Sequence, residues 1–303
     1  MPSFIFDYQE VNLPERQDVS IYGVVKKTKL SCLPVSYFQE IIGGKMTIKD
    51  WAIQGAEVGL DGIDLSILFL KSKDPDYLDV VRHEILDTGI RVAMVTTYPD
   101  FTHPDPKQRE HELSILQEDI VAASRLGADL IRVTAGQAHP IVKRDEGIEW
   151  AVQGLTRAVE FAKNYTVTLV YENHAKPGAW RYVDFSHPTD IFLSIVERTR
   201  GVSLGVNWDT ANVIAYGDDP IPVLKKVVNR VISVHAADTS SRGELTPVLL
   251  GTGLVPFREM FEILHSAKFD GWMCMEEASF KGKAGVKAAA EFVRSVWNEV
   301  IGQ

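Results

Sequence analysis

Eight short apolar runs alternate with amphipathic segments over most of this chain. The runs are continuous rather than alternating in polarity, which is typical of strands that are buried on both faces of a sheet. Strict alternation of strands with helices predicts a parallel sheet. Eight such units between residues 29 and 303 fit a closed (β/α)₈ barrel better than an open doubly wound sheet, which stays the alternative. We therefore expect a single-domain TIM barrel after an irregular N-terminal extension over residues 1–28.

Helix-capping residues indicate where several of these segments begin and end. Thr47 precedes a helical pattern as an N-cap, and Pro188 stands in a favoured first-turn position. Gly89 and Gly127 follow two further helical patterns, where glycine most easily takes the left-handed closing conformation. Between the helices we expect strands over residues 29–34, 62–67, 90–96, 130–134, 166–172, 202–208, 230–234 and 271–275.

Charge and cysteine content limit the partners and the compartment. The chain has 41 acidic and 32 basic residues, and a net charge of −9 disfavours binding to nucleic acid or an anionic membrane. No apolar run approaches the ~20 residues that cross a bilayer, and the N-terminus lacks the pattern of a signal peptide. Cys32 and Cys274 lie far apart in apolar surroundings, so we expect two reduced, buried thiols and a cytoplasmic protein.

The irregular stretches are distributed unevenly. The longest ones after the extension are 98–106, 174–187 and 236–255, and each of them follows an expected strand. In a barrel, the segments after the strands form the C-terminal face, where active sites are built. The sequence therefore predicts one functional face.

Four of the apolar runs end close to a side chain that can bind a metal. These are Glu172, Asp209, His235 and Glu276, separated by 37, 26 and 41 residues. Neighbouring parallel strands lie ~4.8 Å apart, so four consecutive strand ends form an arc that one cation can bridge. Three carboxylates and one imidazole suit Mn²⁺, with Mg²⁺ or Co²⁺ as alternatives, better than a closed structural zinc site.

Each of these residues also has a purely structural interpretation. Asp209 before Thr-Ala-Asn is a common helix cap, and His235 could be a core histidine with satisfied hydrogen bonds. Glu172 could pair with a Lys or Arg across the barrel mouth, and Glu276 could be solvated, as could Glu277 beside it. Their shared position favours a metal site, because Asp and Glu are rarely buried without a partner or a metal.

The motifs around these residues resemble those of the xylose-isomerase-like TIM-barrel superfamily. The resemblance covers roughly residues 29–300. Its marks are Tyr-Glu-Asn-His at Glu172, Trp-Asp-Thr-Ala-Asn at Asp209, Val-His-Ala-Ala-Asp at His235, Gly251-Thr252-Gly253-Leu254-Val255-Pro256-Phe257, and Gly271-Trp272 leading to Glu276. It implies the ligand set Glu-Asp-His-Glu. It also favours Glu276 over Glu277, because the family places this ligand five residues after the strand-opening glycine.

The resemblance implies a metal-dependent isomerase or epimerase for a sugar, keto-sugar or related polyhydroxylated carbonyl compound. In this mechanism a carboxylate removes the proton next to the carbonyl and an enediolate forms. Glu172 and Glu276 are then both ligands and proton carriers. The alternative is a lyase on the same scaffold, either an inosose-type dehydratase or a C-glycoside-cleaving subunit that works with a second subunit type on a 3-keto-glycoside.

One position departs from the ketose 3-epimerases, which carry a His three residues after the Asp ligand where this chain has Asn212. A DNA-repair enzyme like endonuclease IV is disfavoured by the acidic charge and by the presence of only eight histidines. A non-catalytic binding subunit would be expected to have lost a ligand. As substrate-binding residues we expect His174, Arg242 and His139, which follow strands at the same face, and we expect an oligomer.

Overall fold

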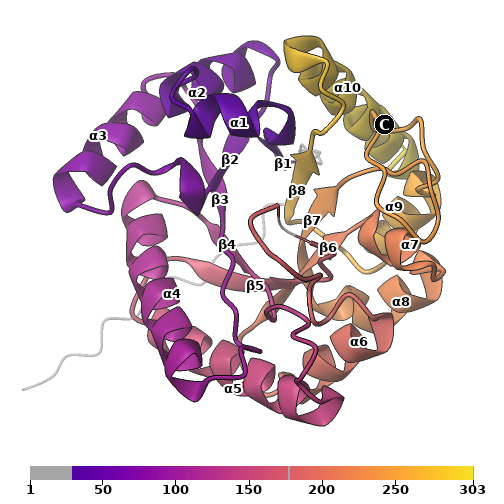
Figure 1. Cartoon of the computed structure of the whole chain (residues 1–303). Helices are drawn as coiled ribbons and strands as arrows, with labels where there is room; N and C mark the ends of the chain where they lie inside the picture. The colour runs from indigo at the N-terminus through magenta and orange to yellow at the C-terminus, as the bar shows by residue number, and fades with distance from the viewer. Residues whose placement is uncertain (1–28, 177, 303) are drawn as a thin grey trace, which may run out of the picture.

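The computed structural model describes residues 29–176 and 178–302, so the expected extension over residues 1–28 lies outside the described residues. Eight parallel strands form a barrel inside a ring of helices (Figure 1). The strands are β1 (Lys29–Leu33), β2 (Gly62–Ser66), β3 (Arg91–Thr96), β4 (Leu130–Val133), β5 (Thr168–Glu172), β6 (Gly205–Asp209), β7 (Val231–Ala236) and β8 (Trp272–Glu276).

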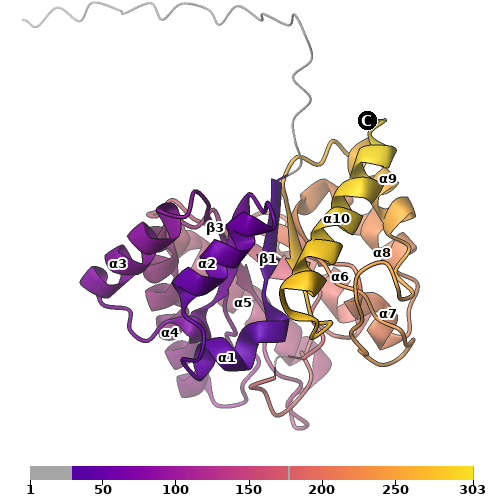
Figure 2. The same cartoon turned by 90° about the horizontal axis from the view of Figure 1, so that it is seen from above.

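Eight longer helices follow the strands and surround the barrel (Figures 1 and 2). They are α2 (Ile48–Glu57), α3 (Pro75–Leu86), α4 (Pro106–Leu126), α5 (Arg144–Ala162), α6 (Thr189–Arg198), α8 (Pro220–Val227), α9 (Phe257–Ser266) and α10 (Gly282–Val300). The shorter elements are α1 (Phe38–Ile42), α7 (Asn212–Tyr216) and the 3₁₀ turns η1 (Val35–Tyr37), η2 (Ile67–Phe69) and η3 (Val228–Arg230).

The barrel is closed between its first and second strands. Hydrogen-bonded pairing runs β1-β8-β7-β6-β5-β4-β3-β2. At the remaining seam, the Asp61 amide donates to the Leu30 carbonyl at 2.8 Å, and the Ser31 hydroxyl donates to Asp64 Oδ1 at 2.8 Å. The prediction of a single (β/α)₈ barrel is confirmed, and the open sheet is excluded.

Most of the capping residues act as the sequence predicted, but Pro188 is the N-cap before α6 and does not lie in its first turn. Thr47 and Asp50 form a reciprocal capping box at the start of α2, with distances of 3.0 and 2.9 Å between side chain and backbone. Gly127 ends α4 with a left-handed φ of 76°, and Gly89 follows α3 with a φ of 85°. These conformations favour glycine because it lacks a Cβ.

The bounds of two expected strands were wrong, and two short helices were not expected. β6 begins at Gly205 rather than near Val202, and β7 extends to Ala236, so His235 lies inside its strand. The helices α1 and α7 were not expected, because five residues are too short to show a helical period. Both short helices lie in loops at the C-terminal end of the barrel, where they help to shape the functional face.

A buried polar layer leads through the barrel toward that face. The Ser233 hydroxyl donates to Asn207 Oδ1 at 2.6 Å, and the Asn207 amide donates to Glu172 Oε2 at 3.2 Å.

The thiols Cys32 and Cys274 are free and buried, as expected, and burial raises their pKa values. Among the described residues, none of the helices has the length and apolarity needed to span a bilayer.

Candidate active site

The four candidate ligands lie together at one rim of the barrel. Glu172, Asp209 and Glu276 are the last residues of β5, β6 and β8, and His235 is the last but one of β7. Asp209 and His235 are direct partners in the register of β6 and β7. Because parallel strands all end at the same face, the sequence order β5 to β8 becomes an arc of neighbouring side chains.

Three of the four side chains converge on one point. One ligand atom from each of Glu172, His235 and Glu276 lies within 4.8 Å of the other two. His235 Nδ1 is 3.2 Å from Glu172 Oε2 and 3.1 Å from Glu276 Oε1. Glu172 and His235 are fully buried, whereas the Glu276 side chain is 21% exposed. Glu276 is therefore the carboxylate of this group that a bound molecule can reach.

The charges of this cluster call for a cation. Burial alone would lower the pKa of His235, but the carboxylates of Glu172 and Glu276 raise it well above its usual value. Burial raises the pKa of Glu172, but the charges of His235 and Arg132 outweigh it and hold the pKa below the ordinary range. The two carboxylates thus favour positive charge on the neighbouring imidazole, and they would stabilise a divalent ion beside them for the same reason.

Asp209 has features of both roles that the sequence left open, a helix cap and a metal ligand. Its Oδ1 accepts the amides of Ala211 at 2.8 Å and Asn212 at 2.7 Å, which fixes the start of α7. Its Oδ2 is buried without a hydrogen-bond partner. Burial, followed by the charges of Glu276 and Glu172, raises the pKa of Asp209 well above its usual value. Oδ1 therefore caps the start of α7, and Oδ2 is available to bind a ligand.

The unpartnered atoms test whether the site fits a metal ion. Glu172 Oε1 and Asp209 Oδ2 are both buried and lack hydrogen-bond partners. Buried polar atoms are normally paired, and leaving one unpaired costs ~1–3 kcal/mol or more for a charged group. Oxygens of this kind, beside an imidazole that faces the same point, match the ligand chemistry of a divalent cation.

Arg132 is a functional residue that the sequence reasoning missed. It lies on β4, fully buried, with Nε 2.9 Å from Glu172 Oε2 and with a hydrogen bond of 2.8 Å from Nη1 to the Thr97 carbonyl. Its guanidinium also stacks over the ring of Tyr98, 4.9 Å from the centroid. A lone arginine inside the apolar run Leu130–Val133 was the available signal, because such a charge must find a buried partner.

The three expected substrate-binding residues are in different surroundings. His174 lines the cavity above the cluster, and its Nδ1 has no hydrogen-bond partner. Because burial lowers the pKa of His174 to about 4, its ring is neutral at pH 7. Arg242 instead donates to the carbonyls of Gly217 at 3.2 Å and Asp218 at 2.8 Å. His139 is 2.8 Å from Asp100 Oδ2. Neither Arg242 nor His139 is among the residues that line this cavity.

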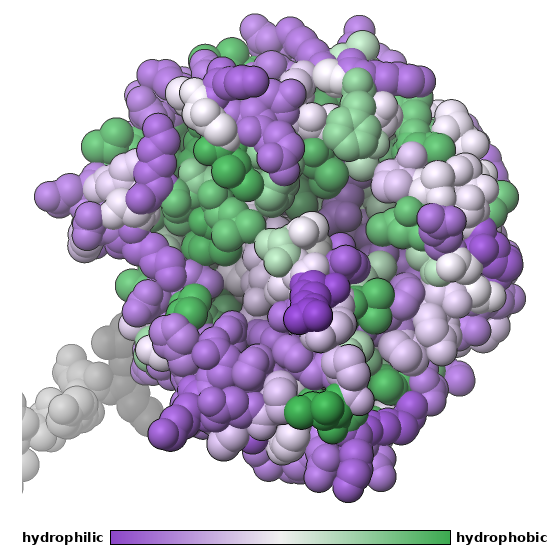
Figure 3. All heavy atoms as spheres, in the orientation of Figure 1, coloured by the Kyte–Doolittle hydropathy of each residue, from purple (hydrophilic) through white to green (hydrophobic). Residues whose placement is uncertain are grey.

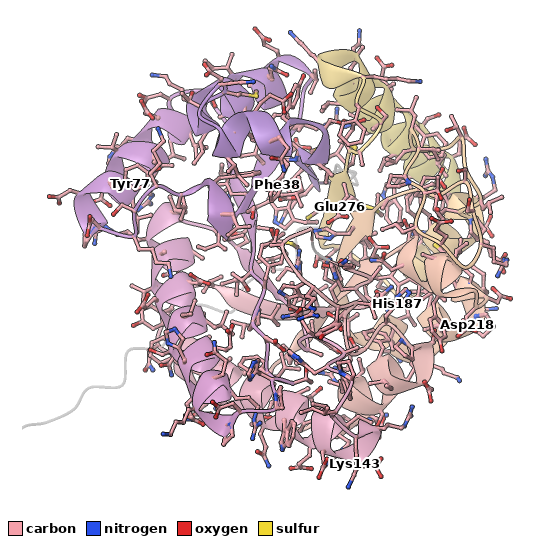
Figure 4. The ribbon with its side chains drawn as sticks, in the orientation of Figure 1. Phe38, Tyr77, Lys143, His187, Asp218 and Glu276 are labelled. Atoms are coloured by element: carbon pink, nitrogen blue, oxygen red, sulfur yellow. The ribbon has the colours of Figure 1, made fainter. Side chains whose placement is uncertain are left out.

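The cavity has a volume of about 520 Å³ and opens at the centre of the face in Figure 3. Its polar floor includes Arg132, His174, Asp209 and Glu276, with Asn212 nearby. Figure 3 also shows hydrophobic side chains gathered beside the central hollow. Phe38 and Glu276, both labelled in Figure 4, line the cavity from the first and the last parts of the barrel.

Comparison with known proteins identifies the family of this barrel. The family model of the xylose isomerase-like TIM barrel matches residues 54–296. The chain belongs to this family. The motifs that suggested the resemblance lie within or beside the matched region, so the expected superfamily is confirmed.

Among similar proteins, an inosose dehydratase from Geobacillus thermodenitrificans is 22% identical over 82% of this chain and 89% of its own length. An inosose dehydratase from Clostridium tetani is 28% identical over 46% of this chain, and that match spans half of the relative's length. These names apply to the relatives themselves.

Several solved structures share the fold at low identity. The IolI protein with a bound zinc atom has a TM-score of 0.72 at 17% identity, covering 91% of this chain and all of its own. A D-psicose 3-epimerase from Clostridium cellulolyticum H10, solved with D-tagatose, has a TM-score of 0.72 at 15% identity, covering 89% and 99%. At these identities the likeness establishes the barrel.

Proposed function

We propose that this protein is a divalent-metal-dependent isomerase or epimerase that acts on a sugar, keto-sugar or related polyhydroxylated carbonyl compound. The convergence of Glu172, His235 and Glu276 on one point beneath an open cavity carries this proposal. With Asp209 they would hold Mn²⁺ in the first instance, with Mg²⁺ or Co²⁺ as alternatives. When bound, such an ion stabilises negative charge that develops on a carbonyl oxygen.

The two glutamates have different surroundings, which supports different tasks. Glu276 is partly exposed and lines the cavity, so we assign it the removal of the proton from the carbon beside the carbonyl. Glu172 is fully buried between Arg132 and His235, which keep it ionised and hold its position. In the proposed reaction Glu172 is therefore first a ligand, and it acts as a proton carrier only if substrate binding draws it away from Arg132.

His174 is our candidate for contacts with the substrate. It lies two residues beyond Glu172, faces the cavity, and keeps an unpartnered ring nitrogen. A neutral imidazole can accept a hydrogen bond from a substrate hydroxyl or pass a proton to and from it. For an epimerase, the proton returns to the same carbon from the other side; for an isomerase, it returns to the neighbouring carbon.

A lyase is the second candidate, and it is favoured by relatives named inosose dehydratase that align over most of their length. The first step would be the same removal of a proton by Glu276. The electron pair would then expel a substituent from the next carbon instead of being reprotonated, and a hydroxyl leaving group would depart as water after taking up one proton. Asn212, which lines the cavity, stands where ketose 3-epimerases carry a histidine and is compatible with this outcome.

The test uses the purified chain with Mn²⁺ and a panel of keto-sugars, inososes and 3-keto-glycosides in D₂O. Deuterium at a substrate carbon with the atoms of the substrate otherwise retained indicates isomerisation or epimerisation. Loss of water or of an aglycone indicates a lyase. If no compound exchanges a proton or yields a product with Mn²⁺, Mg²⁺ or Co²⁺, the proposed function is wrong.

A further inference from the structure

The upper part of the cavity is much less polar than its floor. One side is formed by Val35, Phe38, Ile42, Leu68 and Phe280, which we call the apolar wall. Thirteen large hydrophobic residues are exposed in the described part of the chain, and four of them line this one cavity: Ile42 at 48%, Leu68 at 44%, Leu245 at 40% and Phe280 at 75%. Such a concentration at a single hollow marks a binding surface rather than ordinary surface scatter.

The apolar wall is built from loops that follow different strands. Residues 35–42 come after β1, where η1 and α1 carry Val35, Phe38 and Ile42 over the mouth of the barrel. Leu68 lies in η2 after β2, and Phe38 packs edge-on against the ring of Phe69, with 4.8 Å between the centroids. The wall therefore rests on a buried aromatic side chain and is supported from below.

Phe280 is held in an unusual conformation. Its φ is 56°, in the left-handed region that phenylalanine rarely adopts, and its side chain is largely exposed. Its amide donates to the Ser36 hydroxyl at 2.8 Å, and that hydroxyl donates to Glu277 Oε2 at 2.5 Å. The other oxygen of Glu277 accepts the Ser279 amide at 2.8 Å. A buried network thus fixes an exposed aromatic ring at the cavity mouth, which is typical of a functional position.

A free sugar would match the floor but not this wall. Its hydroxyl groups can bond with Arg132, His174 and the carboxylates. Against the apolar wall the same hydroxyl groups would lose water without gaining partners, which is unfavourable. The cavity volume of about 520 Å³ also falls within the ~300–1,000 Å³ of pockets that bury drug-sized ligands.

We propose that the substrate has two chemically different parts: a polyhydroxylated carbonyl part that binds at the floor, and an aromatic or aliphatic substituent that packs against the apolar wall. This inference rests on the proposed function, because it specifies the substrate of the same site. It assigns Phe38 and Phe280 as specificity-determining residues, since aromatic rings give both buried area and edge-to-face contacts. Glu277 and Ser36 are positioning residues that act through Phe280.

The test compares two 3-keto-glucosides, one with a methyl and one with a 4-nitrophenyl group at the anomeric oxygen, by calorimetric titration of the Mn²⁺-loaded chain. We expect the aryl glycoside to bind about tenfold more tightly, because its ring removes apolar surface from water. Phe280→Ala should bring the two dissociation constants close together, mainly by weakening the binding of the aryl glycoside. Phe280 is mostly exposed, so its removal should spare the fold, and Ile141→Ala at another exposed position is the matched control.

Equal affinities for the two glycosides in the unaltered chain would overturn the inference, as would an aryl preference that Phe280→Ala leaves intact. If Phe280→Ala instead changes the oligomeric state in sedimentation without changing the affinity ratio, the wall is a subunit contact and the inference is wrong. Binding is measured without turnover, so failure here is distinct from failure of the proposed chemistry. If the chain turns over free keto-sugars but shows no aryl preference, the proposed function stands and the two-part substrate is wrong.

Discussion

The two halves of the barrel contribute differently to the cavity. The strands β5 to β8 carry all four proposed ligands, and three of them, Glu172, His235 and Glu276, place a ligand atom within 4.8 Å of one another. The strands β1 to β4 contribute Arg132, and the loops after β1 and β2 form most of the apolar wall. Ligands of one ion must be close neighbours, whereas substrate contacts can come from any loop around the mouth. The comparison separates residues for the chemistry from residues for recognition.

The largest expected effect is on turnover and metal binding by the residues at the ends of β5 to β8. Glu276→Gln removes the proposed base and one negative ligand, so we expect turnover to fall at least about 10³-fold and Mn²⁺ binding to weaken. Steady-state kinetics and metal content after dialysis measure the two effects. Glu259→Gln, at an exposed position on α9, is the matched control and should leave both unchanged. Full activity of Glu276→Gln would refute the site assignment.

The second prediction concerns how much Arg132, on β4, stabilises Glu172, on β5. Arg132→Met leaves Glu172 buried without its arginine partner, which should lower the free energy of unfolding by about 3–5 kcal/mol. Urea titrations measure this loss. Arg91→Met removes an exposed arginine that pairs with Asp129, and it should cost less than about 1 kcal/mol. If Glu172→Gln added to Arg132→Met recovers no stability, the two residues are not coupled.

Metal binding should itself stabilise the folded chain. At a free Mn²⁺ concentration 100 times the dissociation constant, the free energy of unfolding should rise by about 2.7 kcal/mol over that of the EDTA-treated protein. Asp209→Asn should reduce this gain, because Asp209 Oδ2 has no other partner. Thermal or urea unfolding with and without Mn²⁺ gives the measurement. Identical curves would mean that these side chains do not form a metal site.

A smaller effect concerns a carboxylate in the first half. Burial is the main cause that raises the pKa of Asp64 to about 7. The Asp64 side chain therefore keeps a proton in the folded chain that it loses near pH 4 in the unfolded chain, so its contribution to stability is fully present below that pH and falls by about 1.4 kcal/mol per pH unit until pH 7. Asp64→Asn should flatten this slope in metal-free protein. Unfolding at pH 5 and pH 6.5 tests it, and equal slopes in both proteins would contradict the assignment.

The sequence was sufficient for the features that depend on local pattern. The barrel, the helix caps and the strand-end positions of Glu172, Asp209 and Glu276 follow from hydrophobic periodicity and from capping residues that act within a few positions. The strand order also follows, because alternation of strands and helices allows few arrangements.

The remaining features depend on contacts between distant parts of the chain. Arg132 and Glu172 belong to neighbouring strands but are 40 residues apart, and Ser36 meets Glu277 across 241 residues. The apolar wall gathers residues from three loops, none of which has a recognisable pattern by itself. Arg242 and His139 follow the right strands, yet their side chains bind neighbouring loops. A position on the correct face does not determine where a long side chain points.

The adjacent pair Glu276-Glu277 has a consequence for how this barrel can change. Successive residues at a strand end point to opposite sides, so one carboxylate faces the proposed metal and the other holds the loop that carries Phe280. A slip of one residue in β8 would move both carboxylates away from their present partners at once. Changes within residues 35–42, by contrast, can alter the substituent that fits while the metal ligands stay in register. Substitutions at the cavity mouth can therefore change the preferred substrate more readily than substitutions at the floor can change the reaction.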